Sequence, residues 1–234
     1  MGVLNKVCVT GLTNNQLKII AMVSMLLDHI GLELLPQFPV LRILGRLAFP
    51  VFAYMIAEGC AHTKNRKRYF WQIAGLGLAC QAVFTIVDGS WYMGILITFS
   101  LAVLTIFSID WYRKQRDGLS FVVMTVVILS VLFLTLIAPE LFEKQGFLVD
   151  YGLAGVSLPV VVYYGRGKKQ KLLLAAAVLV VFGLISGGIW WYSLLALPLL
   201  LLYNQKRGTA NLKYLFYIFY PSHLAAIYLV GMIV

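Results

Sequence analysis

The sequence predicts an all-α integral membrane protein, a polytopic bundle of about nine transmembrane helices in one domain over residues 1–234. Hydrophobic residues make up 61% of the chain and charged residues only 12%. The mean hydropathy is +0.88. Since a soluble domain is roughly half apolar and about a quarter charged, most of this chain is expected to lie in lipid.

Apolar runs follow one another along the chain, and a spanning helix needs about 20 such residues. The expected spans cover residues 17–35, 40–62, 69–87, 91–112, 119–139, 147–164, 171–186, 188–204 and 213–233. Pro36 and Pro39 separate the first two spans. The pair Gly187-Gly188 marks either a tight turn between two short spans or a break in one longer irregular segment.

Lysine and arginine occur in every second loop, and this alternation predicts an orientation. The basic groups are Lys6 with Lys18 and those in residues 64–68, 113–116, 166–171 and 206–213. The positive-inside rule then places the N-terminus in the cytoplasm and the C-terminus outside. We therefore interpret the net charge of +10 as a topology signal and expect no nucleic-acid partner.

The N-terminal residues and the cysteines give further expectations. Residues 1–15 lack the charged start, apolar core and cleavage site of a signal peptide, so the first span is expected to act as an uncleaved signal. The three cysteines, Cys8, Cys60 and Cys80, show no metal-ligand spacing. We expect structural thiols and no metal site.

Ionisable residues inside the expected spans are the main functional signal, because a charge there costs about 3 kcal/mol or more. His29, next to Asp28, would lie roughly 18 Å above the cytoplasmic face, near the middle of the membrane. Arg46 would lie roughly 9 Å below the outer face, and His223 roughly 15 Å above the inner face. Asp150 opens the sixth span on the outer side. Four spans thus bring ionisable groups to the middle or outer half of the membrane.

Most of these residues also have a structural explanation, which for Asp28 and His29 is a helix-packing hydrogen bond or an ion pair with Arg46. Asp28 and His29 point about 100° apart on a helix, so one is expected to orient a partner while the other reacts. Arg46 is equally suited to pairing with Asp28 and to binding an anion or oxyanion. His223 follows Pro221, which kinks a helix, and a structural and a functional role are equally supported.

A second polar group lies near the cytoplasmic end of the second span. Glu58 and His62 are four residues apart, so they share one helix face, and a solvated helix end beside a basic loop explains them best. The run from Lys64 through Arg66 to Arg68 is first a topology signal. It also suits the phosphates of a nucleotide-like cofactor at the cytoplasmic surface.

Four blocks of the sequence resemble the TraX family. They read LKIIAMVSMLLDHIG, LRILGRLAFPVFAYMIAEGCAHTKNRKRY, VDYGLAGVSLP and YLFYIFYPSHL. Their most specific elements are DHIG, GRLAFPxFA, EGxxHT and FYPxHL, and their order suggests membership over the full length. One departure lies in the fourth span, where Gly94 stands at the place of an asparagine that the family often shows.

The resemblance implies an acyltransferase of the bacterial cytoplasmic (inner) membrane. The family's namesake is similar to an acetylase of conjugative pilin that acts on the N-terminal amine of the pilin. Cytoplasmic acetyl-CoA would be the acyl donor. An amine or hydroxyl of a peptide, a glycan or a lipid-linked group would be the acceptor, at the membrane or its extracytoplasmic face among the membrane lipids.

Motif positions also imply site residues. His29 is carried over as the catalytic base, with Asp28 beside it and Arg46 in the same site. Further residues are expected to bind the substrates. These are Glu58, His62, Lys64, Arg66, Arg68, Asp150, Tyr151 and His223.

Two other classes of protein would explain Asp, His and Arg within the membrane. A proton-coupled transporter needs such residues and would move its substrate without consuming acetyl-CoA. A non-catalytic membrane assembly protein would use them only to lock helices together. The sequence leaves open the acceptor, the length of the acyl group and the oligomeric state.

Overall fold

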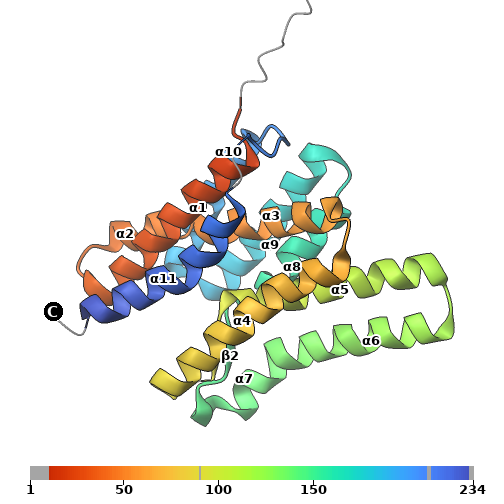
Figure 1. The fold of residues 1–234 in the computed structure, drawn as a ribbon, viewed down its shortest axis with the longest axis horizontal. Helices are drawn as coiled ribbons and strands as arrows, with labels where there is room; N and C mark the ends of the chain where they lie inside the picture. The colour runs from red at the N-terminus through yellow and green to blue at the C-terminus, as the bar shows by residue number, and fades with distance from the viewer. Residues whose placement is uncertain (1–10, 90, 210–211, 232–234) are drawn as a thin grey trace, which may run out of the picture. The chain divides into compact units, whose positions relative to one another are not determined.

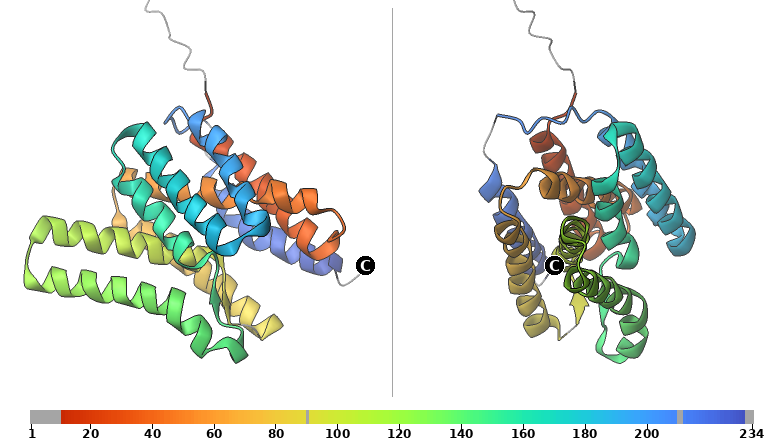
Figure 2. Two further views of the ribbon diagram at one scale, coloured as in Figure 1. Left: turned by 180° about the vertical axis from the view of Figure 1, so that it is seen from behind. Right: turned by 90° about the vertical axis from the view of Figure 1, so that its right-hand side faces the viewer.

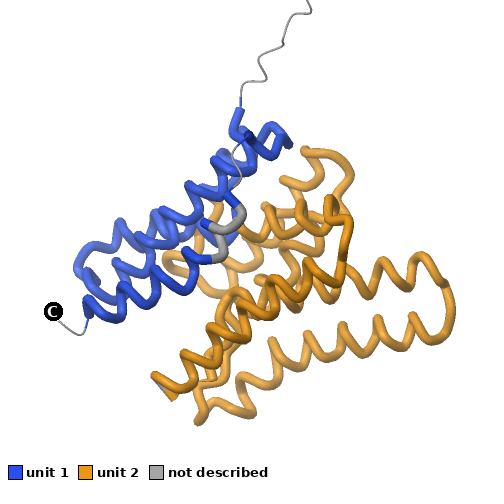
Figure 3. The backbone as a smooth tube through the Cα atoms, in the orientation of Figure 1, with its two compact units in different colours: residues 1–51, 195–234 blue, residues 52–194 orange. Residues whose placement is uncertain are grey.

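The computed structural model describes residues 11–89, 91–209 and 212–231, most of them helical. The chain divides into two compact units, which Figure 3 distinguishes. Unit 1 comprises residues 1–51 and 195–234, and unit 2 comprises residues 52–194. The division falls inside one helix, α3 (Ala48–His62). The prediction of one domain over residues 1–234 stays a prediction.

Unit 1 is built from both ends of the chain. Besides the first residues of α3, its elements are α1 (Asn14–His29), the π-helix η1 (Ile30–Leu34), α2 (Pro39–Gly45), α10 (Ala196–Leu201) and α11 (Lys213–Gly231). α1 packs against α2 and α11, and Figure 1 shows these three helices side by side. The Leu12 N–H donates to the Leu202 carbonyl at 2.8 Å, and the Asn204 N–H donates to the Leu12 carbonyl at 2.9 Å. These bonds join the start of the described chain to the segment after α10.

A local sequence signal sets the start of α1. The Thr13 hydroxyl accepts from the Gln16 N–H at 3.3 Å, and the Thr13 N–H donates to Gln16 Oε1 at 2.8 Å, which forms a capping box. After His29 the helix widens into η1, where the Leu35 N–H donates to the Ile30 carbonyl at 2.9 Å. Such π-helical turns are frequent at functional sites, and this one begins directly after His29.

The predicted span over residues 40–62 coincides with the helical segment Pro39–His62, in which a turn at residues 46–47 separates α2 from α3. A turn follows Gly45, and α3 begins at Ala48. Pro50 accounts for the break, because a proline ring within a continuous helix clashes with the carbonyl of residue i−4, here Arg46. Arg46 therefore lies at the C-terminal end of α2.

Unit 2 is a helical bundle around α5. Its elements after α3 are α4 (Arg66–Asp88), β1 (Tyr92–Met93), α5 (Ile95–Gln115), α6 (Gly118–Leu132), the π-helix η2 (Phe133–Ile137), α7 (Ala138–Leu141), the 3-10 helix η3 (Glu143–Gln145), β2 (Leu148–Val149), α8 (Gly152–Tyr164), α9 (Gly167–Ser186) and the 3-10 helix η4 (Gly188–Leu195). α5 packs against α4, α6 and α8, and α8 packs against α9. Figure 2 shows α5 and α6 as a long antiparallel hairpin. Ala102, Val103 and Ile106 form the fully buried face of α5.

Two predicted spans begin later than expected, because short strands precede their helices. β1 and β2 pair in parallel, with Tyr92 opposite Leu148. The helices of the predicted spans 91–112 and 147–164 therefore begin after the strands, α5 at Ile95 and α8 at Gly152. The strand pairing satisfies backbone N–H and C=O groups that no helix satisfies.

Five helices in the described part of the chain are long and apolar enough to cross a membrane. They are Pro39–His62, Arg66–Val87, Ile95–Gln115, Gly118–Leu141 and Gly167–Ser186. Shorter apolar helices cover Gly152–Tyr164, Gly188–Leu201 and Ile218–Gly231. The chain thus has the character of a helical membrane protein, whereas the count of nine spans and the orientation of the termini stay predictions.

Gly187 and Gly188 form a turn between two helical segments. Both have positive φ, 64° and 51°, a backbone conformation that favours glycine. The rings of Phe182 and Trp190 lie 5.1 Å apart, whereas eight residues of straight helix would separate them by about 12 Å. The chain therefore folds back here, which favours the tight turn over one broken segment.

Candidate active site

In unit 1, Asp28 is held by two arginines. Arg42 Nη1 donates to Asp28 Oδ2 at 2.8 Å, and Arg46 forms an ion pair with Asp28 Oδ1. Arg46 is 2% exposed, and its Nε also donates to the Arg42 carbonyl at 3.3 Å. The pairing of Arg46 with Asp28, one of the two roles considered for this arginine, is present in the structure.

Two glycines let α2 approach α1 this closely. A Cβ added to Gly45 would overlap the Cβ and Oδ1 of Asp28. A Cβ added to Gly31 would lie 2.7 Å from the Cβ of Leu41. Gly31 belongs to the DHIG block and Gly45 to the GRLAFP block, so the two blocks form a single packed site.

The cluster of Asp28, Arg42 and Arg46 has one positive charge in excess, because two guanidinium groups face one carboxylate. Arg42 is the more accessible of the two arginines, with a side chain 20% exposed against 2% for Arg46. Charges act more strongly where water is excluded. The cluster is therefore suited to stabilise an anion that forms beside it.

His29 follows Asp28 but contacts different neighbours. Its Nδ1 lies 2.8 Å from the carbonyl oxygen of Met25. A carbonyl only accepts hydrogen bonds, so Nδ1 carries the proton, and Nε2 of the neutral ring has a free lone pair. A histidine fixed in one tautomer in this way is suited to act as a general base.

α11 brings His223 next to His29. The ring centroids lie 5.1 Å apart, with the ring planes at 73°. His223 is 5% exposed, and its Nδ1 lies 2.8 Å from the Phe219 carbonyl oxygen. Unit 1 therefore contains two pairs of predicted site residues, Asp28 with Arg46 and His29 with His223, and Asp28 and His29 are neighbours in the sequence.

Glu58 and His62 lie in unit 2. Glu58 is 6% exposed, and Lys171 of α9 donates from Nζ to Glu58 Oε1 at 2.6 Å. The His62 Nδ1 lies 2.8 Å from the Glu58 carbonyl oxygen, and the His62 side chain is 76% exposed. His62 thus occupies an exposed helix end, as its position predicts, whereas Glu58 is a buried member of an ion pair.

Arg66 has a partner within unit 2. Its Nη2 lies 2.5 Å from Asp110 Oδ2. The hydroxyls of Tyr163 and Tyr164 also donate to the Asp110 carboxylate, at 2.6 and 3.0 Å. Arg66 therefore ties the start of α4 to α5, and the two tyrosines tie the end of α8 to the same carboxylate.

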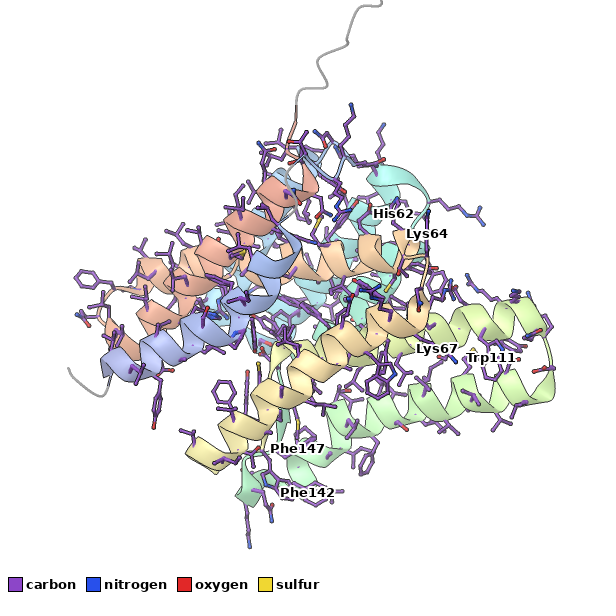
Figure 4. The ribbon with its side chains drawn as sticks, in the orientation of Figure 1. His62, Lys64, Lys67, Trp111, Phe142 and Phe147 are labelled. Atoms are coloured by element: carbon purple, nitrogen blue, oxygen red, sulfur yellow. The ribbon has the colours of Figure 1, made fainter. Side chains whose placement is uncertain are left out.

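The other predicted phosphate-binding residues, Lys64 and Arg68, are exposed. Figure 4 shows Lys64 beside His62 at the turn between α3 and α4, with Lys67 further along α4. Asn65 caps α4 by accepting from the Arg68 N–H at 2.9 Å. The cap holds this basic turn in place, and its role in binding stays a prediction.

Asp150 and Tyr151 join β2 to α8. The Tyr92 hydroxyl donates to Asp150 Oδ1 at 2.7 Å, and the Thr98 hydroxyl donates to the Asp150 carbonyl at 2.9 Å. Tyr151 has a φ of 57°, and its ring lies 5.5 Å from that of Trp190. Asp150 therefore connects the strand pair to α5, and a binding role for either residue stays a prediction.

Three charged residues escaped the sequence-based predictions. Arg42 lies one helical turn before Arg46, and this i,i+4 spacing is the signal that points to it. Lys171 and Asp110 lie at the ends of predicted spans, where charges are ordinary. Only the fold pairs them with Glu58 and Arg66.

Comparison with known proteins identifies the family. A family model described as TraX protein matches residues 13–231. The chain is 25% identical over 239 residues to the probable fimbrial assembly protein FimC, serogroup H1, of Dichelobacter nodosus, across 90% of this chain and 92% of that protein. It is 50% identical over 44 residues to the uncharacterized protein RP591 of Rickettsia prowazekii (strain Madrid E), which is 18% of each chain. No solved structure matches the chain. Because the family model extends from the N-cap of α1 to the end of α11, the chain belongs to the TraX family.

Proposed function

We propose that this protein is a membrane-embedded acyltransferase. It moves an acetyl group from cytoplasmic acetyl-CoA to an amine or hydroxyl acceptor at the membrane or its extracytoplasmic face. The observation that carries the proposal is His29, fixed in one tautomer next to a carboxylate that two arginines hold. Membership of the TraX family supports it, since the family's namesake is similar to a pilin acetylase.

His29 is the general base of the proposed reaction. Its Nε2 takes the proton from the acceptor N–H or O–H as the nitrogen or oxygen attacks the thioester carbonyl. A C–N or C–O bond forms, the C–S bond breaks, and the electron pair leaves with the sulfur. The CoA thiolate then takes the proton from His29, which restores the starting state of the enzyme. This direct transfer needs no cysteine nucleophile.

The arginines supply the positive charge that this reaction requires. Negative charge develops on the thioester oxygen and then on the leaving sulfur. In our proposal Arg42, the more accessible arginine, stabilises this charge, and buried Arg46 holds Asp28 in place. Asp28 therefore positions the arginines, because its described polar contacts are with them.

We assign the phosphates of acetyl-CoA to Lys64 and Arg68 at the predicted cytoplasmic surface. Phosphate binding requires accessible cations, and both side chains are exposed. Arg66 contributes less, because Asp110 already pairs with its guanidinium group.

The relative in Dichelobacter nodosus bears on the acceptor, because its name refers to fimbrial assembly. Among the peptide, glycan and lipid-linked acceptors, this name favours a peptide that belongs to a surface filament. The same name supports a second candidate function, a membrane assembly protein without catalysis. In that case the cluster of Asp28, Arg42 and Arg46 would only hold helices together.

Calorimetric binding of acetyl-CoA and CoA to the purified protein in detergent tests the proposal. We expect saturable binding by both the wild type and His29→Ala, because His29 acts in the chemical step. Release of CoA from acetyl-CoA is expected from the wild type alone. The double variant Lys64→Gln/Arg68→Gln should weaken binding by about tenfold, since two charged contacts with phosphate are lost.

The alternatives predict different results. A folded, monodisperse protein that binds neither acetyl-CoA nor CoA would favour the assembly function. Substrate uptake into vesicles without release of CoA would indicate a transporter. Undiminished CoA release by folded His29→Ala would reject His29 as the base.

A further inference from the structure

The buried Nε2 atom of His223 makes no hydrogen bond to any residue that the structure describes. The residue is 5% exposed, so bulk water does not satisfy this atom. Nδ1 already faces the Phe219 carbonyl oxygen at 2.8 Å, so Nδ1 is protonated and Nε2 of the neutral ring has a free lone pair. Buried polar atoms in folded proteins are nearly always hydrogen-bonded, and an exception requires an explanation.

Aromatic rings surround His223 on several sides. Phe219 stacks on it with a centroid separation of 4.7 Å and an interplanar angle of 7°, and Tyr220 contacts it edge-on at 5.7 Å. The ring of His29 also contacts it, with a centroid separation of 5.1 Å. Asp28, which precedes His29 in the sequence, is paired with the two arginines of α2.

His29 and His223 have the same bonding arrangement. In each, Nδ1 faces the carbonyl of the residue four positions earlier in the chain, at 2.8 Å. With the proton on Nδ1, the neutral form of either ring has no Nε2–H to donate to the other. One added proton supplies the missing donor, because a protonated Nε2 of one ring can donate a hydrogen bond to the unprotonated Nε2 of the other.

The proposed function supplies such a proton, and the following inference rests on it. We propose that His223 is a positioning residue that stabilises protonated His29. When His29 Nε2 takes the proton of the attacking amine or hydroxyl, this N–H donates a hydrogen bond to Nε2 of His223. The bond persists until the proton passes to the CoA thiolate, and His223 itself forms no covalent bond. Because the bond exists only after proton transfer begins, it lowers the barrier without tightening substrate binding.

Three substitutions at position 223 distinguish the contribution of ring packing from the contribution of the Nε2 atom. Gln places a polar atom near the position of Nε2, Asn places one near Nδ1, and Phe keeps the ring without either nitrogen. We expect His223→Phe and His223→Asn to lower kcat roughly 10- to 100-fold, the value of a hydrogen bond to a charged group. We expect His223→Gln to stay within about fivefold of the wild type and the KM for acetyl-CoA to stay unchanged in all three.

The kinetic assay is acetylation of glycinamide by acetyl-CoA, with the protein in lipid nanodiscs. Ser222→Ala is the matched control, because the Ser222 hydroxyl donates to the same Phe219 carbonyl at 3.2 Å and the residue is exposed. This variant should stay within about twofold of the wild type. Full activity of His223→Phe would overturn the inference, because ring packing would then suffice. Equal losses in the Gln and Phe variants would overturn it as well.

A spectroscopic measurement tests the histidine pair without any acyl transfer. The chain has 3 histidines, so ¹⁵N-histidine labelling and single substitutions assign every ring. On partial protonation we expect a ¹⁵N–¹⁵N scalar coupling across the hydrogen bond between His29 and His223, with His62 uncoupled. If the protein shows this coupling but no transferase activity, the proposed function is refuted, whereas the hydrogen bond between His29 and His223 stands. If His223 Nε2 exchanges magnetisation only with a bound water, the hydrogen bond between His29 and His223 is refuted, whatever the transferase activity.

Discussion

Asp28 shows how one partly buried carboxylate gives two arginines a defined place. Arg46 is 2% exposed, and a buried charge without a partner would destabilise the fold by about 3–5 kcal/mol. Asp28 removes this penalty through its ion pair with Arg46. The same carboxylate orients Arg42, whose side chain remains partly accessible. Because Arg46 is buried and Arg42 is accessible, we assign a structural role to Arg46 and a role in the reaction to Arg42.

Substitution of Arg42 separates these roles. We expect Arg42→Gln to fold normally, because Arg46 still pairs with Asp28. CoA release should fall about 100-fold, the usual effect of removing one group that stabilises an oxyanion. Rates of CoA release and thermal unfolding in detergent measure both effects.

Arg113→Gln is the matched control, because this exposed arginine stacks on Tyr164 in unit 2 and has no place in the proposed reaction. Normal catalysis by Arg42→Gln would show that Arg42 has only a structural role.

At the scale of helices, the contact between α1 and α2 positions the site. It depends on Gly45, where a Cβ would overlap Asp28. We expect Gly45→Ala to push α2 away from α1, to weaken both ion pairs of Asp28, and to lower both Tm and CoA release. Thermal unfolding and the CoA-release assay measure these changes.

Gly75→Ala on α4 is the control for this helix contact, because nothing lies within 4 Å of a Cβ added there. A mid-helix glycine costs about 0.5–1 kcal/mol relative to alanine, so this variant should be at least as stable as the wild type. If Gly45→Ala behaves like Gly75→Ala, the close contact between α1 and α2 does not determine the site.

The start of α6 has a pH-dependent cap. Asp117 Oδ1 accepts from the Ser120 N–H at 2.7 Å, and hydrogen bonding to Ser120 holds the pKa of Asp117 below its ordinary value of 3.8. Such a carboxylate contributes stability that is present above the unfolded pKa and is lost as the pH falls through the folded pKa.

We therefore expect the wild type to have a higher Tm than Asp117→Asn near pH 7, and the two to converge as the pH falls through the lowered pKa of Asp117. Asparagine keeps a capping oxygen but not the charge. Thermal unfolding across this pH range checks the prediction, and a difference that does not vary with pH would contradict it.

At the scale of the whole molecule, the sequence predicts the apolar helices well. It predicts poorly which residues far apart in the chain lie side by side. Apolar runs identify the helices, because burial in lipid requires them. The break before α3 also follows from local chemistry, since Pro50 excludes a continuous helix. The pairing of Tyr92 with Leu148 is different, because two-residue strands leave no alternating pattern. Within the site, the DHIG and FYPxHL elements indicate His29 and His223, but only the fold shows that their rings touch.

The orientation predicted from the basic loops is testable across the membrane. Lys114, in the last turn of α5, and Lys144, in η3, lie at positions that the positive-inside rule places on opposite sides. In a background with Cys8, Cys60 and Cys80 replaced by serine, we expect an impermeant maleimide to label Lys144→Cys from outside the cell. Lys114→Cys should react only in inverted vesicles. Labelling of both from the same side would refute the alternating topology.

The proposed role of His29 in transfer from acetyl-CoA is tested most directly by the initial rate of glycinamide acetylation by the protein in nanodiscs. We predict that wild type releases one CoA for each acetylglycinamide formed. His29→Gln should bind acetyl-CoA with unchanged affinity and react about 10²- to 10⁴-fold more slowly, the range for loss of a general base. Equal rates for the two proteins, or no acetylation by a wild type that is folded, would contradict the account.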